Sequence, residues 1–307
     1  MAEARRVLVT GATGFIGAHA LEPLHARGFE VHALTRRPER VPSFAHAHAG
    51  DMLVPAAVEG VVGDVTPTHL LHLAWCTEHG RFWSAPENVT WLEASLHLVR
   101  AFTAAGGRRM VVAGTCAEYE WNEEPCVEDG TPLRPATLYG AAKHALHTVL
   151  ARYAPLHGIE YAWPRIFHLY GPGEPAARFV PAIIRACLAG THVDTTHGSQ
   201  VRDFLHASDV AGACVALLDS GVQGAVNIGS GEPVTLRDVI AVIEREAGCP
   251  GTARLGALGA PEGEPQRLVP DITRLRDEVG WSPSLDLATG IRDVASYWRD
   301  AARGVSA

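Results

Sequence analysis

The sequence predicts an α/β fold in which a doubly wound parallel sheet is joined to a smaller α/β lobe. Three observations support this prediction. In the first half of the chain, short apolar runs alternate with segments of helical periodicity. The first apolar run leads directly into a glycine-rich turn, and the regular alternation ends near residue 165. Uninterrupted apolar strands separated by helices are typical of a parallel sheet that is covered on both faces.

The apolar runs of the first half define four expected strands. They are Val7–Thr10, Val31–Leu34, His69–Ala74 and Arg109–Ala113. Ligands of such sheets bind beyond the carboxyl ends of the strands. The residues that directly follow these runs are therefore the first candidates for a functional site.

Beyond about Arg165 the pattern becomes less regular, and loops rich in glycine and proline appear, such as Tyr170–Glu174. We therefore expect a sheet domain over residues 1–165. Residues 166–307 are expected to form mainly a smaller, substrate-binding lobe, with some elements returning to the large sheet.

Composition and charge narrow the class of protein. Of the 307 residues, 47% are hydrophobic and 20% are charged, as in an ordinary globular protein. The net charge of −8 argues against a nucleic-acid-binding protein, which normally has a basic surface. No segment has the length and hydrophobicity of a signal peptide or a membrane span. We therefore expect a cytoplasmic protein without nucleic-acid or membrane partners.

Cysteine and histidine patterns bear on redox state and metals. The six cysteines are scattered and include no CxxC pair, which favours reduced thiols. The sixteen histidines form no HxxxH or HxH cluster beside a carboxylate, so we predict no metal site.

The residues after the first strand form a turn suited to a dinucleotide. Thr10–Gly17 reads TGATGFIG and precedes a helix-forming stretch. Gly11 allows a tight turn, Gly14 lets the backbone approach a pyrophosphate, and Gly17 lets the helix pack against the strand. The helix N-terminus offers N–H groups and the positive end of its dipole to the phosphates. We therefore predict a Rossmann cofactor site. The other residues of the turn expected to contact the cofactor are Thr13, Phe15 and Ile16.

The end of the second strand bears on which dinucleotide binds. Folds that bind NAD usually place an acid there, which accepts hydrogen bonds from the ribose hydroxyls. Here Arg36 and Arg37 follow the strand instead. Two guanidiniums suit the 2′-phosphate of NADP(H), although both could be solvated surface charges. Asp51 and Met52 are expected beside the adenine.

A tyrosine, a lysine and a threonine form a candidate catalytic set. Tyr139 and Lys143 are four residues apart, on one face of an expected helix. A nearby ammonium favours the phenolate, so the tyrosine can exchange a proton with a carbonyl oxygen. Thr115 ends a strand twenty-four residues before Tyr139, and its hydroxyl can hydrogen-bond the same oxygen.

These motifs resemble the extended short-chain dehydrogenase/reductases, the NAD(P)-dependent nucleotide-sugar epimerase/dehydratase family. The similarity runs along nearly the whole chain, through segments such as Pro164–Pro172, Val201–Leu205 and Asn227–Gly231. The cofactor contacts that the resemblance implies, besides Tyr139 and Lys143, are Leu73, Ala74, Trp75, Asn88 and Phe167. The substrate contacts that it implies are Trp75, Trp83, Thr115, Cys116, Ala117, His168, Val180, Arg202 and Arg267.

Four of these implied substrate contacts need comment, because the residue type supports them to different degrees. Arg202 matches the family arginine that binds the substrate's diphosphate. His168 stands where the family usually has an asparagine near the phosphates, and a packed histidine is an equal alternative. Of Trp75 and Trp83 we expect one to stack on the sugar, although interior packing explains most tryptophans.

One departure from the family pattern concerns the reaction. In the family's 4,6-dehydratases an Asp-Glu pair follows the catalytic threonine and carries out the elimination. Here Cys116 and Ala117 follow Thr115, so dehydration is not expected.

The function expected from the sequence is NADPH-dependent reduction of a keto group, at C4 of a nucleotide-diphospho-4-keto-6-deoxy sugar. It depends mainly on Arg36 and Arg37, because reductases draw on NADPH whereas epimerases mostly retain NAD. The alternatives are a nucleotide-sugar 4-epimerase with the same triad and a redox-sensing scaffold without activity. The resemblance also implies a homodimer, in which two long helices, Ser84–Ala105 and Thr137–Ala154, pair into a four-helix bundle.

Overall fold

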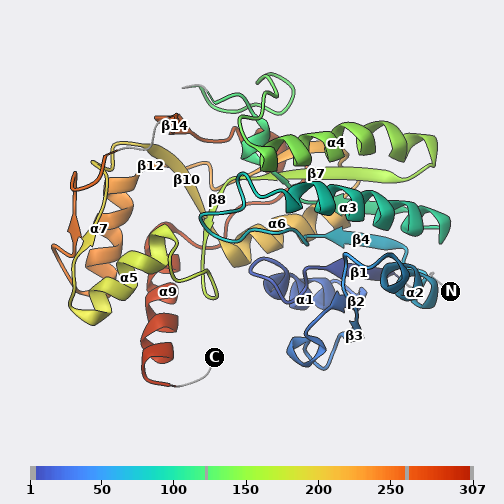
Figure 1. Cartoon of the computed structure of the whole chain (residues 1–307), viewed down its shortest axis with the longest axis horizontal. Coiled ribbons are helices and arrows are strands. Elements are labelled where there is room, and N and C mark those ends of the chain that lie inside the picture. The colour runs from blue at the N-terminus through green and yellow to red at the C-terminus, as the bar shows by residue number, and fades with distance from the viewer. Residues whose placement is uncertain (1–4, 122–123, 260–262, 305–307) are drawn as a thin grey trace.

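The computed structural model describes residues 5–121, 124–259 and 263–304, and a parallel sheet of eight strands forms its centre (Figure 1). Every pairing in this sheet is parallel, which confirms the predicted α/β class. In spatial order the strands are β11 (Gly224–Ile228), β7 (Glu160–Ile166), β5 (Arg109–Val112), β4 (His69–His72), β1 (Arg6–Thr10), β2 (Glu30–Thr35) and β3 (His46–Ala49), with β6 (Gly114–Thr115) beside β7.

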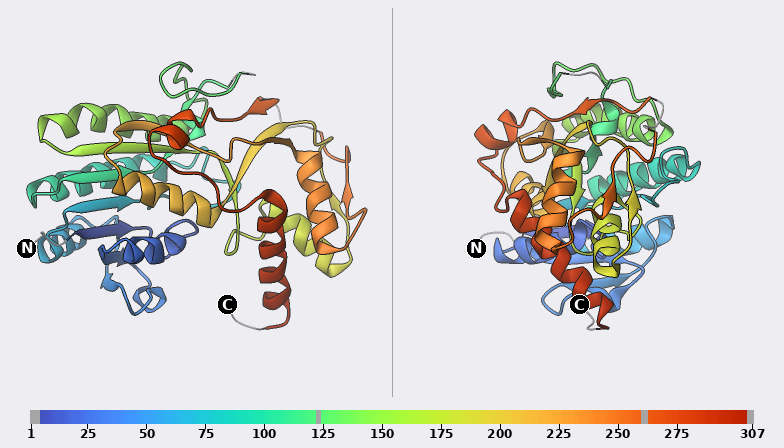
Figure 2. Two further views of the ribbon diagram at one scale, coloured as in Figure 1. Left: turned by 180° about the vertical axis from the view of Figure 1, so that it is seen from behind. Right: turned by 90° about the vertical axis from the view of Figure 1, so that its left-hand side faces the viewer.

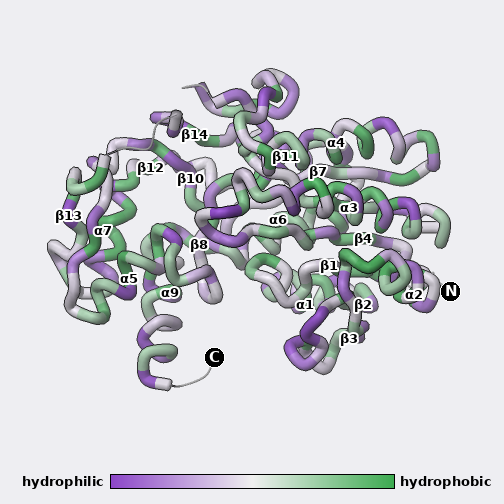
Figure 3. The backbone as a smooth tube through the Cα atoms, in the orientation of Figure 1, coloured by the Kyte–Doolittle hydropathy of each residue, from purple (hydrophilic) through white to green (hydrophobic). Residues whose placement is uncertain are grey.

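Helices cover both faces of the sheet, as its uninterrupted apolar strands require. On one face, α1 (Gly17–Ala26) and α6 (Ala207–Asp219) bury side chains against β1 and β7. On the other face lie α2 (Pro55–Val65), α3 (Glu87–Ala104) and α4 (Leu138–Leu156). The two long helices predicted from the sequence are α3 and α4, and they lie side by side (Figure 1). Hydrophobic and hydrophilic residues alternate along the helices, as expected when one side of each faces a core (Figure 3).

A second, smaller lobe lies next to the large sheet, along the long axis of the molecule (Figures 1 and 2). Its small sheet contains β8 (His168–Tyr170), β10 (Val201–His206), β12 (Pro233–Thr235) and β14 (Arg267–Leu268), and β9 (Val193–Asp194) pairs with β13 (Ala253–Arg254). Its core is built with α5 (Phe179–Ala189), α7 (Leu236–Ala247) and α9 (Leu287–Ala302), and α8 (Thr273–Asp277) lies against β11.

The chain passes between the two lobes several times. It leaves the large sheet after Ile166 and returns to it with α6 and β11. The division into residues 1–165 and 166–307 remains a prediction.

A disulfide corrects the expectation of reduced thiols. Cys187 on α5 is bonded to Cys249, which follows α7, and their Cα atoms are 5.5 Å apart. The two residues are 62 positions apart in the sequence, so only the packing of α5 against α7 brings them together. Cys76, Cys116, Cys126 and Cys214 are free.

None of the helices in the described part of the chain combines the length and the hydrophobicity needed to cross a membrane.

Candidate active site

The turn after β1 forms a cradle of backbone groups. Gly11 has a φ of +73°, in the left-handed region that favours glycine. A Cβ on Gly11 would lie 2.8 Å from the backbone nitrogen of Ala74, and one on Gly17 would overlap the carbonyl oxygen of Gly11. The N–H of Gly14 donates to the carbonyl of Gly11 at 2.9 Å, and none of the described side chains caps the start of α1. This close approach of turn, helix start and β4 fits the pyrophosphate of a nicotinamide dinucleotide.

The remaining residues predicted around this turn lie at the carboxyl ends of β1 and β4. Thr13 and Phe15 are half-buried, whereas Ile16 and Leu73 pack against the core beneath the sheet. The N–H of Leu73 donates to the carbonyl of Thr10 at 3.1 Å. The side chains of Ile16 and Leu73 thus contribute to packing, and their contact with a cofactor stays a prediction.

The end of β2 carries the two arginines predicted to select the cofactor. The hydroxyls of Thr13 and Thr35 are 3.0 Å apart, which joins the glycine turn to the end of β2. Arg36 and Arg37 follow directly and are exposed. A guanidinium nitrogen of Arg36 lies 3.8 Å from the carboxylate of Asp51. The arginines are thus next to the turn that would hold the adenosine ribose. Met52, which the sequence also placed beside the adenine, is buried in the core together with Leu34 of β2.

Thr115 begins the short turn Cys116–Glu118, where its hydroxyl is held by the backbone. The hydroxyl accepts the N–H of Ala117 at 3.2 Å, and the Thr115 N–H donates to the Glu118 carboxylate at 2.8 Å. This reciprocal capping fixes the position of the hydroxyl.

Tyr139 lies against this turn at the start of α4. A Cβ on Gly140 would overlap the backbone of the turn, so glycine there lets α4 approach closely. The Tyr139 ring is packed edge-on against Phe82 and Trp83, with centroids 5.0 and 5.9 Å away. Burial raises the pKa of Tyr139, and a hydrogen bond with Thr115 opposes this rise. The phenol is therefore protonated at neutral pH when the protein is alone.

Lys143 lies one helical turn after Tyr139 and is also buried. Its Nζ donates to the carbonyl of Ala113 at 2.8 Å and lies 3.9 Å above the ring of Trp75. Burial lowers the pKa of Lys143 to about 7, and the negative charge of Glu118 limits the fall. The structure thus brings Thr115, Tyr139 and Lys143 to one edge of the sheet.

A buried ion pair, which the sequence did not predict, lies beneath these residues. The Glu118 carboxylate accepts hydrogen bonds from Trp163 Nε1 at 2.9 Å and from Arg165 Nε at 3.2 Å, besides the N–H of Thr115. Neither charged side chain has significant exposure. The signal in the sequence was an arginine inside the apolar strand β7. Glu118 supports the Thr115 turn from within the core and does not face a substrate.

Asn88 and the predicted tryptophans form the wall beside Tyr139. The Asn88 amide donates to the carbonyls of Phe82 and Ala85, both at 2.8 Å, and its oxygen accepts Trp75 Nε1 at 2.8 Å. Asn88 therefore holds the loop before α3 and positions Trp75. Trp83 is partly exposed, at 41%, and is the tryptophan better placed to meet a sugar.

Three cationic or polar side chains converge on the substrate side of the site. His168 Nδ1 and Arg178 Nε are buried and have no hydrogen-bond partner in the described part of the chain. Burial lowers the pKa of His168 to about 3, and the charges of Arg202 and Arg178 lower it further. Arg178 also lies over the ring of Phe82, 5.7 Å from its centroid, and Arg202 is paired with Glu264 at 3.0 Å. This group suits an anion such as a diphosphate. Sequence reasoning missed Arg178, two residues before the predicted Val180.

Other predicted substrate and cofactor residues occupy different surroundings. Val180 is buried in the apolar core of the second lobe, where its side chain packs between helices, and its contact with a substrate stays a prediction. Phe167 is also buried, and its N–H donates to Ile228 at 3.1 Å. Arg267 is half-buried on β14. Burial raises the pKa of the Cys116 thiol to about 12, so it stays protonated.

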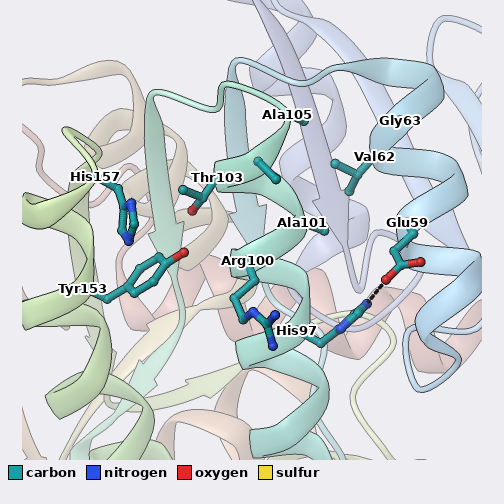
Figure 4. Close-up of a pocket in the computed structure, with 11 residues that line it drawn as sticks. Glu59, Val62, Gly63, His97, Arg100, Ala101, Thr103, Ala105, Tyr153 and His157 are labelled. Carbon is teal, nitrogen blue, oxygen red and sulfur yellow. Dashed lines mark ion pairs between the residues drawn. The ribbon is translucent and has the colours of Figure 1, made fainter.

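A separate groove of about 760 Å³ lies on α2, α3 and α4 and is not part of this site (Figure 4). Nε2 of His97 lies 3.3 Å from the Glu59 carboxylate across it, and Tyr153 and His157 line its other side. The groove is formed by the later turns of α3 and α4. Since these helices run antiparallel to the strands, their ends lie at the amino ends of the strands, opposite Thr115 and Tyr139.

Known proteins share both the sequence pattern and the fold. Residues 7–229 match the NAD dependent epimerase/dehydratase family. A UDP-glucose 4-epimerase of Rhizobium meliloti is 28% identical over 95% of this chain and 96% of its own. A CDP-abequose synthase of Salmonella typhimurium is also 28% identical, over 94% of this chain and 96% of its own.

A solved structure shows a similar arrangement. The Thermus thermophilus UDP-glucose 4-epimerase, in complex with NAD, is 29% identical and superposes with a TM-score of 0.84, covering 96% of this chain and 99% of that one. Together with the glycine cradle and the buried Thr115, Tyr139 and Lys143, the match to the family over residues 7–229 leads to one conclusion: the chain belongs to the NAD dependent epimerase/dehydratase family.

Proposed function

We propose that the protein is a nucleotide-sugar 4-epimerase, which inverts C4 of a nucleotide-diphospho-sugar through a 4-keto intermediate. The observation that carries the proposal is the convergence of Thr115, Tyr139 and Lys143 beside the dinucleotide cradle. The sequence alone favoured a reductase over an epimerase. We reverse that order, because several of the relatives of this chain are UDP-glucose 4-epimerases.

The proposed chemistry needs a proton acceptor and donor at the C4 oxygen. A nicotinamide dinucleotide, when bound, supplies the hydride exchange at C4. Tyr139 takes the hydroxyl proton as the ketone forms and returns it when the ketone is reduced. Thr115 orients the C4 oxygen through its hydroxyl, whose position is fixed by the turn. Lys143 supplies a nearby positive charge that stabilises the phenolate. Because its pKa is about 7, Lys143 can lose or regain a proton near neutral pH.

The residues after Thr115 argue against elimination of water. A 4,6-dehydratase needs an acid and a base next to the sugar. Cys116 and Ala117 provide neither, because the alanine has no titratable group and the thiol of Cys116 is kept protonated by burial. Glu118, the nearest carboxylate in the sequence, is bound to Arg165 in the core.

The substrate's diphosphate would lie among His168, Arg178, Arg202 and Arg267. Arg178 supports this proposal most directly, because its buried Nε has no hydrogen-bond partner among the described residues. Arg202 would share its guanidinium between Glu264 and the ligand. Trp83 would pack against the sugar, next to the Tyr139 ring.

A second function, reduction of a 4-ketosugar by NADPH, is favoured by one observation. Arg36 and Arg37 stand at the end of β2, where an acid usually binds the ribose of NAD. Their guanidiniums suit the 2′-phosphate of NADP(H), which we propose as the preferred cofactor for either reaction. The structural relative from Thermus thermophilus was solved with NAD, so the preference must be measured.

One experiment separates the two functions. The purified protein is incubated with UDP-glucose, and in parallel with an enzymatically generated nucleotide 4-ketosugar and NADPH. Products are separated by anion-exchange chromatography while NADPH absorbance is followed. An epimerase forms the C4 epimer of UDP-glucose, or of another nucleotide sugar in a panel, without net use of NADPH. Stoichiometric loss of NADPH with the ketosugar, and no epimer from any nucleotide sugar, would instead assign the reductase.

Assembly and location remain predictions. We propose a homodimer through α3 and α4, whose outer side carries the groove of Figure 4. The protomers would pair about a twofold axis. Sedimentation at micromolar concentration measures this, and a monomer would contradict it. Cytoplasmic location is proposed on the sequence argument alone, and the disulfide in the second lobe makes cell fractionation a necessary check.

A further inference from the structure

A cluster of imidazoles and one carboxylate lies at the edge of the large sheet, outside the candidate active site. The edge strand β3 begins with His46 and also carries His48, and the neighbouring strand β2 carries Glu30 and His32. The parallel register pairs His32 with His46. Because side chains two positions apart share a face of a strand, all four groups project from the same face. Glu30 and His32 lie in the amino-terminal half of β2 and His46 begins β3, whereas His48 is aligned with Leu34, nearer the carboxyl end of β2.

The donor atoms of three of these residues converge. His32 Nε2 lies 3.1 Å from the Glu30 carboxylate, and His46 Nε2 lies 3.9 Å from the same oxygen. One donor atom from each residue lies within 4.8 Å of the other two. A tetrahedral zinc ion with bonds of about 2.0–2.2 Å separates its ligands by roughly 3.3–3.6 Å. Small side-chain rotations therefore bring Glu30, His32 and His46 to the spacing of a zinc site.

His48 occupies the place of an outer partner. Its Nε2 lies 3.0 Å from Nδ1 of His32. Metal-binding histidines almost always hydrogen-bond through their second ring nitrogen, which fixes the ring and its tautomer. With Nε2 of His32 on a metal, its Nδ1 carries the proton and donates to His48. This rearrangement moves protons only within the two neutral rings, so it releases none.

We propose that Glu30, His32 and His46 bind one zinc ion, with His48 as the outer hydrogen-bond partner of His32 and water as the fourth ligand. Imidazole and carboxylate together suit zinc and neighbouring divalent transition metals. The zinc ion would link β2 to the edge strand β3. The loop between these two strands carries Arg36 and Arg37. The sequence predicted no metal site because the carboxylate is not beside the HxH pair along the chain; strand pairing supplies it.

The site is tested by calorimetric titration of Zn²⁺ into the full chain, free of tags and previously treated with chelator. The wild type is expected to bind one zinc per chain, and zinc is expected to raise its melting temperature in a concentration-dependent way. His46→Gln and Glu30→Gln remove ligands whose side chains are 62% and 43% exposed, so both variants should fold. Each is expected to weaken binding by at least about tenfold, since even outer partners contribute about 10–100-fold.

The matched control is His192→Gln, which removes an exposed histidine of the second lobe. It should bind zinc as the wild type does. Circular dichroism of the metal-free variants verifies that they are folded, so a loss of binding reports the site itself. The proposal is overturned if the wild type binds no zinc, if His46→Gln binds as tightly as the wild type, or if His192→Gln loses binding to the same extent.

Discussion

Replacing Lys143 with methionine is expected to stabilise the cofactor-free protein while it abolishes activity. Burial lowers the pKa of Lys143 from 10.5 to about 7. Since one pKa unit corresponds to about 1.4 kcal/mol, the folded protein disfavours the charged ammonium by roughly 4–5 kcal/mol below neutral pH. Methionine has a similar length and no charge to desolvate.

Two lost interactions reduce this gain. The carbonyl of Ala113 would lose the hydrogen bond from Nζ, which costs about 1–3 kcal/mol for a buried acceptor. The contact of the ammonium with the Trp75 ring contributes about 0.5–2 kcal/mol. At the middle of these ranges the desolvation exceeds the two losses together, so we expect Lys143→Met to raise the free energy of unfolding by roughly 1 kcal/mol at neutral pH.

Urea denaturation of the cofactor-free wild type and variant, at about pH 7 and about pH 9, measures this difference and its pH dependence. The folded-state pKa of Lys143 lies below the unfolded value, so between these values the unfolded chain binds the extra proton. The wild type therefore gains stability as pH rises above about 7, by up to about 1.4 kcal/mol per pH unit, and the advantage of the variant shrinks accordingly. If the variant is less stable at neutral pH, or if the difference does not change with pH, the desolvation argument is wrong.

Three further perturbations test other parts of the site. Tyr139→Phe keeps the ring but removes the exchanged proton, so turnover should fall by about 10²–10⁴-fold while cofactor still binds; single-turnover kinetics with near-normal rates would assign the proton to another group. Neutral residues in place of Arg36 and Arg37 should weaken NADPH binding by about 1.5–3 kcal/mol per lost charged hydrogen bond and leave NADH nearly unaffected, as fluorescence titration can measure; equal losses for both would exclude a contact with the 2′-phosphate. Glu118→Ala leaves Arg165 buried without its carboxylate and should lower the free energy of unfolding by about 3–5 kcal/mol, whereas unchanged thermal stability would show that water replaces the carboxylate.

The sequence alone predicted the features that depend on local patterns. Continuous apolar runs identified the parallel strands, because a strand buried on both faces cannot alternate with polar residues. The glycine spacing of Thr10–Gly17 indicated the cradle, because backbone close approach excludes a Cβ at fixed positions. The interval of four residues placed Tyr139 and Lys143 on one side of a helix. Each of these inferences uses geometry within one element or across one turn.

Tertiary structure decided what depends on residues far apart in the chain. Glu118 meets Arg165 only because β6 and η2 (Cys116–Glu118) pack against β7. The bond between Cys187 and Cys249 likewise requires α5 to pack against α7.

The same reason explains the site residues and the imidazole cluster that the sequence did not disclose. No motif in the sequence marks Arg178, and only the fold buries its Nε near His168 and Arg202. His46 and Glu30 belong to different strands, and the parallel register of β2 and β3 brings them together. Periodicity in a sequence specifies which face of an element is buried, but the partner of a buried or clustered polar group is specified only when distant elements pack.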